Sequence, residues 1–257
     1  MEKRPWLSVV IPVFNETESL GPLWAELHPV LEGLGQPYEV IFVDDGSRDQ
    51  SGEVVMALKG RHPELRLIRL RWNAGETAAT DAGFRAAHGE VVMTMDADLQ
   101  HDPKDIPLLL DHLSTWDAAC GWRTRREDSW VRRVSSRIAN TVRDALTGDQ
   151  VRDSGCTFRA IRRECLADLR LYSGFHRFLP TLLRLEGYRV IEVPVNHRPR
   201  RFGRSKYGIR NRMLRGLYDL LVVRWMKRRR LRYEVVEERG EGTPPGEPSG
   251  HPDASRR

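Results

Sequence analysis

The chain has 257 residues, enough to bury one large α/β core, and its 42 Lys and Arg against 36 Asp and Glu give a formal net charge of +6. Its three cysteines are odd in number and lack CxxC spacing, so they indicate neither a disulfide framework nor a zinc site and favour a reducing compartment. No uncharged apolar stretch reaches the roughly 18 residues that a membrane-spanning helix needs, so the sequence predicts a soluble or peripheral protein.

The positive charge is uneven, because the basic residues gather after about position 122. A basic half favours a polyanionic or membrane-surface partner. We expect no nucleic-acid partner, since no helix-turn-helix, zinc-knuckle or aromatic-platform pattern accompanies the arginines. The N-terminal residues lead directly into a strand pattern without the apolar region of a signal peptide, which favours a cytoplasmic location.

Apolar strand patterns alternate with amphipathic helix patterns along the N-terminal part of the chain. Such alternation is typical of an α/β fold with a mostly parallel central sheet flanked by helices. The predicted strands cover residues 7–14, 38–43, 65–70, 91–95, 117–121 and 188–195. The predicted helices cover residues 19–34, 48–59, 73–88, 104–113, 130–146 and 209–232.

Carboxylates follow the second and the fourth predicted strand, at the sheet edge where parallel sheets bind ligands. Asp96 and Asp98 occupy alternate positions of an extended segment, so both side chains project to one side while Ala97 turns away. Two carboxylates this close need a positive counter-ion, and Mg²⁺ or Mn²⁺ bridging a diphosphate is the usual one. Asp45 has two interpretations, a ligand contact in the same crevice or a cap on the helix that follows it.

The chain has neither a GxGxxG segment after its first strand nor a GxxxxGK[ST] segment. Their absence disfavours a dinucleotide oxidoreductase and a P-loop NTPase, because both bind phosphate through the backbone amides of such loops. A metal ion would have to neutralise the phosphates instead, which favours a nucleotide-sugar enzyme.

Three segments at these strand ends resemble those of a known family. Residues 10–16 read VIPVFNE, residues 43–47 read VDDGS and residues 96–101 read DADLQH. Together they resemble the family 2 inverting glycosyltransferases of the GT-A fold, and within them the dolichyl- or polyprenyl-phosphate mannose or glucose synthases. The resemblance extends over residues 7–232.

The resemblance implies a nucleotide pocket next to a base and ribose region, and a diphosphate site with its metal. Asp96 and Asp98 are implied to hold Mg²⁺ or Mn²⁺, and Phe14 stands where the family usually has tyrosine. The residues implied to contact the nucleotide, the diphosphate or the metal are Pro12, Phe14, Glu16, Val43, Asp45, Asp96, Ala97 and Asp98.

Later segments add basic residues to the implied site. The resemblance places Arg123 beside a phosphate, and a planar guanidinium suits a bidentate phosphate contact; a solvated surface loop is the alternative. It also implies that Arg200 and Lys206, in an R-x-x-G-x-S-K segment, close over the donor diphosphate. Asp153, in a D-x-G-C-x-F-R segment, could orient the acceptor or contact the metal region, and a buried structural carboxylate is its alternative.

The segment 209–236 is predicted to be a basic amphipathic helix, because apolar residues recur every four positions from Ile209 to Trp225 among arginines. This composition favours a helix on a membrane surface, and packing on the catalytic domain is the alternative. We therefore expect a GT-A catalytic domain over 1–208, the membrane-surface helix over 209–236 and a disordered tail over 237–257, rich in Gly, Pro, Glu and Ser.

These expectations combine into hexosyl transfer from a nucleotide-diphosphate sugar, GDP-mannose before UDP-glucose, to a polyprenyl phosphate at the cytoplasmic face of a membrane. Peripheral attachment there is compatible with a membrane-protein partner. The predicted catalytic residues are Asp98, Arg123, Asp153, Arg200 and Lys206. One alternative is a transferase that uses a hydroxyl acceptor such as a polysaccharide, with Asp153 as the base. Another is a non-catalytic subunit that binds a nucleotide sugar or a lipid phosphate.

Overall fold

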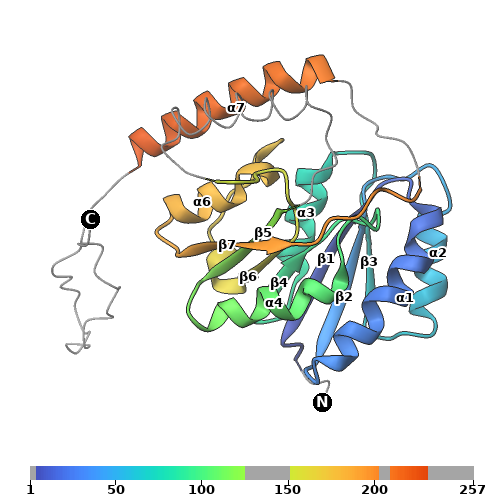
Figure 1. Cartoon of the computed structure of the whole chain (residues 1–257). Coiled ribbons are helices and arrows are strands. Elements are labelled where there is room, and N and C mark those ends of the chain that lie inside the picture. The colour runs from blue at the N-terminus through green and yellow to red at the C-terminus, as the bar shows by residue number, and fades with distance from the viewer. Residues whose placement is uncertain (1–3, 125–150, 203–208, 231–257) are drawn as a thin grey trace, which may run out of the picture.

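The computed structural model describes residues 4–124, 151–202 and 209–230, with the side chains of the last helix described from residue 218 onward. A mixed seven-stranded sheet with the order β3-β2-β1-β4-β6-β5-β7 forms the centre of the fold (Figure 1). Its strands are β1 (Leu7–Val13), β2 (Tyr38–Asp44), β3 (Leu65–Arg69), β4 (Val91–Thr94), β5 (Ala118–Arg123), β6 (Arg159–Arg162) and β7 (Val190–Val195).

Helices cover both faces of the sheet, as the alternating pattern predicts. The helices are α1 (Thr17–Gly33), α2 (Ser51–Lys59), α3 (Glu76–Ala86), α4 (Ile106–Asp111), α6 (Leu179–Leu185) and α7 (Ile209–Arg229). Neighbouring residues of β1 show the two faces: Ile11 packs in one core cluster with Leu27 of α1, and Val10 packs in the other with Phe84 of α3. Successive side chains of a strand point to opposite faces, so a strand buried on both sides is apolar throughout.

Strands β1 to β4 form the parallel half of the sheet. Their observed limits lie within one residue of the predictions, and α1 begins two residues earlier than predicted. Because all four strands run in the same direction, the loops after β1, β2 and β4 meet at one edge. This is the edge at which the sequence predicts the site.

Strand β6 is antiparallel to both of its neighbours, β4 and β5. The sequence analysis predicts no strand at Arg159–Arg162, because four residues with a charge at each end carry no strand pattern. The helix predicted over 104–113 is also less regular than expected: α4 spans six residues between two 3₁₀ turns. The structure adds α6, which the sequence analysis does not predict.

Helix α7 lies across α6 on the side remote from the sheet (Figure 1). Val223 of α7 is fully buried against Phe175, Phe178 and Leu182, so this side of the helix packs on the rest of the fold. None of the helices in the described residues is long and apolar enough to cross a membrane. The helix predicted over 130–146, Lys206 and the predicted tail lie outside the described residues.

Candidate active site

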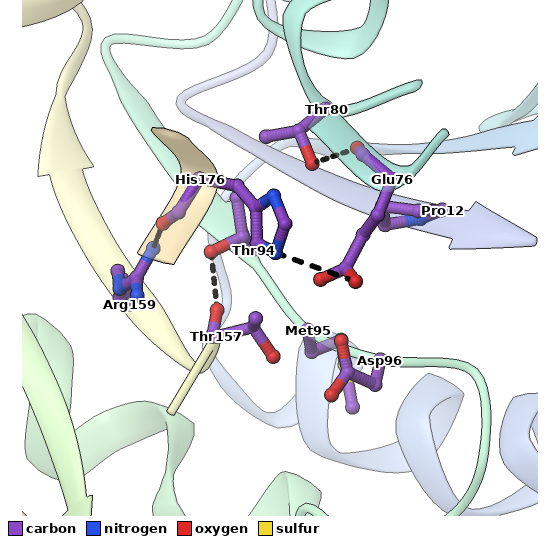
Figure 2. A pocket seen from close by; sticks show the side chains of 9 residues that line it. All are labelled: Pro12, Glu76, Thr80, Thr94, Met95, Asp96, Thr157, Arg159 and His176. Carbon is purple, nitrogen blue, oxygen red and sulfur yellow. Dashed lines mark hydrogen bonds and ion pairs between the residues drawn. The ribbon is translucent and has the colours of Figure 1, made fainter. Parts of the chain in front are cut away.

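A pocket opens beyond the carboxyl ends of β1 and β4, next to the start of α3 (Figure 2). Glu76 and Asp96 extend their carboxylates into the same space (Figure 2). The lining residues are Pro12, Glu76, Thr80, Thr94, Met95, Asp96, Thr157, Arg159 and His176. Of the residues predicted to contact a nucleotide or metal, Pro12 and Asp96 line this pocket directly.

The turn after β4 holds the two predicted metal ligands. Ala97 between them is buried in the core, as the alternation predicts, so its side chain does not face the pocket. Asp98 Oδ1 accepts a hydrogen bond from the Gln100 amide at 3.1 Å. Leu99 adopts a left-handed backbone with φ of 63°, which is rare for a side-chain-bearing residue and concentrates at functional turns. The turn therefore keeps a strained shape that the buried Leu99 side chain anchors.

His101 holds the turn after β4 in place. The Asp96 amide donates to its Nδ1 at 3.2 Å, and its ring stacks on Phe158 with centroids 5.0 Å apart. Burial lowers the pKa of His101 to about 3, so the ring is neutral and Nδ1 is free to accept. Although the sequence analysis includes His101 in a motif, it assigns the residue no role. The structure makes it a positioning residue for Asp96.

Arg200, from the segment after β7, forms an ion pair with Asp98 in the turn after β4. Arg200 Nη2 lies 2.6 Å from Asp98 Oδ2, and the Asp98 side chain is almost fully buried. The sequence analysis places both residues at one diphosphate, and the structure brings them together directly. Lys206, predicted to act beside Arg200, lies outside the described residues.

The charges around Asp96 indicate whether Asp96 and Asp98 could hold a divalent ion. Burial raises the pKa of Asp96, whereas the Thr157 hydroxyl and the guanidinium groups of Arg159, Arg123 and Arg200 favour its charged form. Hard cations such as Mg²⁺ and Mn²⁺ prefer carboxylate oxygens, and Asp96 and Asp98 offer them within one short turn. The donor set therefore fits such an ion.

Arg123 and Asp153 form a bidentate pair. Arg123 Nε lies 2.6 Å from Asp153 Oδ2, and Nη2 lies 2.9 Å from Oδ1, which also accepts from the Gly155 amide. Asp153 is 7% exposed and the Arg123 side chain is 21% exposed, so Arg123 is held by a buried partner while its guanidinium stays accessible. A phosphate contact of Arg123 stays a prediction. The Asp153 carboxylate thereby orients a guanidinium whose charge reaches Asp96.

Asp45 organises the loop that precedes α3. Its carboxylate accepts hydrogen bonds from the Ala74 amide at 2.7 Å, the Gly75 amide at 2.9 Å and the Asn73 side chain at 2.9 Å. The residue that precedes α2 is Gln50, so the interpretation of Asp45 as the cap of the following helix is wrong. Burial raises the pKa of Asp45, although the amides of Ala74 and Gly75 oppose the change. A base or ribose contact of Asp45 stays a prediction.

The remaining residues predicted to contact the nucleotide lie at the ends of β1 and β2. Phe14 and Glu16 are partly buried, and Glu16 is tied to α2 through its amide, which donates to Ser51 Oγ at 2.8 Å. Val43 is fully buried in the core and is not among the pocket residues. Val43 lies in β2 between β1 and β3, so a nucleotide contact of this residue stays a prediction.

The pocket also contains residues that the sequence analysis does not select. His176 Nε2 lies 3.5 Å from Glu76 Oε2, its Nδ1 lies 2.6 Å from Thr77 Oγ1, and Arg159 Nη1 donates to its carbonyl oxygen at 2.7 Å. Arg159 belongs to the D-x-G-C-x-F-R segment, so the sequence carried a signal for it. Nothing in the sequence around His176 pointed to the site, because it reaches the pocket from a 3₁₀ turn far along the chain.

Residues 8–170 match the family model for Glycosyl transferase family 2. The chain belongs to glycosyl transferase family 2. A family relative, the dodecaprenyl-phosphate galacturonate synthase of Rhizobium johnstonii, is 37% identical over 232 residues, which cover 88% of this chain and 68% of that protein.

Solved glycosyltransferases have the same fold. Glucosyl-3-phosphoglycerate synthase from Mycobacterium tuberculosis, crystallised with Mn²⁺ and UDP-glucose, gives a TM-score of 0.66 at 21% identity, covering 86% of this chain and 79% of that one. A mannosyltransferase from Pyrobaculum calidifontis, in complex with GDP-mannose and Mn²⁺, gives 0.53 at 23% identity, covering 75% and 56%. Identities this low establish the fold alone. The GT-A fold and the family 2 resemblance predicted from the sequence are thus confirmed, and this chain is a glycosyltransferase.

Proposed function

We propose that this glycosyltransferase moves a sugar from a nucleotide diphosphate to a polyprenyl phosphate, with inversion at the anomeric carbon. The observation that carries the proposal is that the charges of three guanidinium groups, those of Arg123, Arg159 and Arg200, favour the charged form of the partly buried Asp96 carboxylate. Two carboxylates on one turn, together with three arginines whose charges act on Asp96, suit a diphosphate, a divalent ion and a second phosphate. The name of the Rhizobium relative supports a polyprenyl phosphate as that second phosphate.

Asp96 and Asp98 would hold Mg²⁺ or Mn²⁺, and such an ion neutralises charge on a departing diphosphate. Arg200 would stabilise the same developing charge, because preorganised cations act most strongly in a site shielded from water. Lys206, in the same basic segment, is proposed to assist it.

Arg123 would align the acceptor phosphate, since the Asp153 carboxylate holds its guanidinium in a fixed orientation. A phosphate oxygen is already an anion, so it can attack the anomeric carbon from the face opposite the diphosphate without losing a proton. The alternative hydroxyl acceptor would need a base, and Asp153 suits that role poorly because its oxygens accept from Arg123 and Gly155.

Helix α7 supports the proposal that the enzyme works at a membrane surface. Tyr218, Leu221 and Trp225 are 69%, 50% and 61% exposed, and their spacing of three and four positions places them on one side of the helix. The last turn carries Lys227 to Arg229. Exposed aromatic and aliphatic side chains beside a basic helix end suit an anionic lipid surface, which also presents the lipid acceptor.

We propose three candidate donor sugars. Mannose and glucose are the expectations from the sequence, and the relative's name adds galacturonate. Arg159, which lines the pocket and is 2% exposed, favours including this acidic sugar, because a buried guanidinium attracts a sugar carboxylate.

The test uses the purified full-length protein with GDP-mannose, UDP-glucose or UDP-galacturonate, and with either a short polyprenyl phosphate or the matching polyprenol. Mass spectrometry of the lipid fraction is expected to show a glycosylated polyprenyl phosphate from one donor, none from the polyprenol, and none after EDTA treatment. The Asp96→Asn protein serves as the inactive control. Transfer to the polyprenol but not to its phosphate would overturn the proposal in favour of a hydroxyl acceptor.

A further inference from the structure

A second group of metal-ligating side chains lies at the opposite edge of the sheet from the active site. His28 comes from α1, and His62 and Glu64 come from the connection between α2 and β3. His62 Nδ1 lies 3.2 Å and His28 Nε2 lies 3.7 Å from the same Glu64 oxygen, and one ligand atom from each residue lies within 4.8 Å of the others. The three side chains are between 21% and 32% exposed, so an ion can reach them from solvent.

The ring packing and the backbone hold these side chains in place. Trp24, 5% exposed, has its ring centroid 4.8 Å from both imidazoles, and the two imidazoles are 4.8 Å apart. The His62 amide donates to the Lys59 carbonyl, and the Val40 amide donates to the Glu64 carbonyl, so both loop residues are tied to regular elements. The cluster is therefore ordered before any ion binds, which lowers the entropic cost of binding.

Negative charge is concentrated around the imidazoles. Glu32 Oε1 lies 4.0 Å from His28 Nε2 and accepts a hydrogen bond from the Tyr38 hydroxyl at 2.7 Å. Two carboxylates beside two imidazoles form an environment that favours a divalent cation.

We propose that His28, His62 and Glu64 bind a divalent transition-metal ion, with zinc as the ion that matches the donor set best. Two imidazole nitrogens, one carboxylate oxygen and an open fourth position form a common zinc arrangement. Neighbouring donors of a tetrahedral zinc ion at its usual bond lengths stand about 3.3 Å apart, close to the two separations at Glu64. Glu32 or water would fill the fourth position. Mg²⁺ prefers oxygen donors alone, so this site and the Asp96–Asp98 site would take different ions.

An ion here would join helix α1 to the connection that precedes β3. The two segments pack against each other only through side chains, so a metal would add a cross-link within the α1–α2 layer. Because none of His28, His62 and Glu64 lines the pocket, we expect the ion to act on stability.

The test follows metal binding to the full-length protein after chelator treatment, with excess Mg²⁺ present to fill the Asp96–Asp98 site. Co²⁺ replaces zinc as a spectroscopic probe, and imidazole ligation is expected to give visible absorption bands of a four- or five-coordinate ion. Zn²⁺ affinity is measured by competition with a chromogenic chelator. His28→Ala and His62→Ala are each expected to weaken Zn²⁺ binding by about 10-fold or more, whereas His112→Ala, at the far end of α4, leaves it unchanged.

Circular dichroism in EDTA verifies that each variant is folded. Should an alanine variant fail to fold, the isosteric Glu64→Gln variant decides the question by the same titration. Equal Zn²⁺ affinity in the wild type and in the cluster variants, or an equal loss in the His112→Ala control, would overturn the proposal. The measurement is independent of glycosyl transfer, so it stands whichever sugar and acceptor the enzyme uses.

Discussion

Arg200 Nη2 lies 2.6 Å from Asp98 Oδ2, an ion pair between residues 102 positions apart in the chain. The pair links the segment after β7 to the turn after β4, the two segments that the proposed mechanism brings to the donor diphosphate. A carboxylate cannot offer the same lone pairs to a guanidinium and to a metal ion. Binding of the ion and the diphosphate would therefore give both residues a new partner.

Replacing Arg200 with alanine is expected to lower kcat/KM by about 100-fold or more, the scale of losing one preorganised electrostatic group. Mn²⁺ binding, measured by electron paramagnetic resonance, should stay the same or tighten, because Asp98 loses a competing partner. Arg201→Ala is the matched control, since Arg201 is 56% exposed and contacts Glu26 at 3.5 Å. A parallel loss of activity and Mn²⁺ binding would mean that Arg200 supports the fold of the site instead.

Asp98→Asn is expected to reduce transfer by about 100-fold or more and to raise the Mn²⁺ concentration needed for half-maximal rate. The amide keeps the shape of the side chain but removes the charge that attracts a cation. Steady-state rates over a Mn²⁺ series check this, with the exposed Asp111→Asn on α4 as the control. Unchanged rates in Asp98→Asn would exclude the metal role of this residue.

A double-mutant cycle tests whether Asp153 acts through Arg123. Arg123→Ala should raise the KM for the lipid phosphate by about 10-fold or more with little change in donor affinity, and Asp153→Asn should act in the same direction. The double variant should be about as active as Arg123→Ala alone, because Asp153 acts through Arg123. If Asp153 were a general base, its removal would lower kcat on top of the Arg123 effect and would change the pH profile.

The exposed face of α7 is tested with liposomes. Leu221→Ser and Trp225→Ser should reduce flotation with anionic vesicles, and high salt should weaken binding of the wild type. Leu108→Ser on α4 is the matched control, since Leu108 is 41% exposed and Leu221 is 50% exposed. Binding that ignores both salt and the α7 substitutions would contradict the membrane role of this helix.

Glu39 gives a prediction about stability. Its carboxylate accepts from Ser8 Oγ at 2.6 Å and from the His88 amide at 2.8 Å, and it pairs with Arg66. Glu39→Gln should lower the free energy of unfolding by about 2 kcal/mol at neutral pH, measured with urea. Glu53→Gln, at a 60% exposed position, should change it little.

The Glu39 contribution should also depend on pH. Burial alone would raise the pKa of Glu39, but the hydrogen bonds from Ser8, His88 and Arg66 outweigh it and lower the pKa below its ordinary value of 4.5. The unfolded chain therefore binds this proton more tightly, so the stabilisation is present above pH 4.5 and is lost as the pH falls through the folded-state pKa. The stability difference between wild type and Glu39→Gln should shrink accordingly in acid.

The parallel half of the fold was predictable because each of its strands is an apolar run followed by a polar turn. The same rule predicted Asp96 and Asp98 at the sheet edge and the Ala97 side chain in the core, where Ala97 is buried. The rule could not predict β6, since its pattern is too short and its pairing with β4 depends on distant residues. It also could not distinguish a carboxylate facing ligand from one bonded to a loop, which is why the role of Asp45 changed.

The partners within the site were hidden for a similar reason. Sequence motifs indicated Arg123, Asp153, Asp98 and Arg200 singly, but the pairing of Arg123 with Asp153 and of Arg200 with Asp98 is a property of the folded chain. His176 carried no local signal because its contacts with Glu76 and Thr77 cross 99 or more positions. Such long-range contacts require the structure.

The reversed strand β6 also has a consequence for synthesis on the ribosome. β4 pairs with β1 on one side and with β6 on the other, and β6 is made more than sixty residues later. Until Arg159–Arg162 leaves the exit tunnel, the backbone of β4 exposes a bare edge to neighbouring nascent chains. Fragments that stop before residue 159 should therefore aggregate, whereas fragments that continue past β6 should stay soluble.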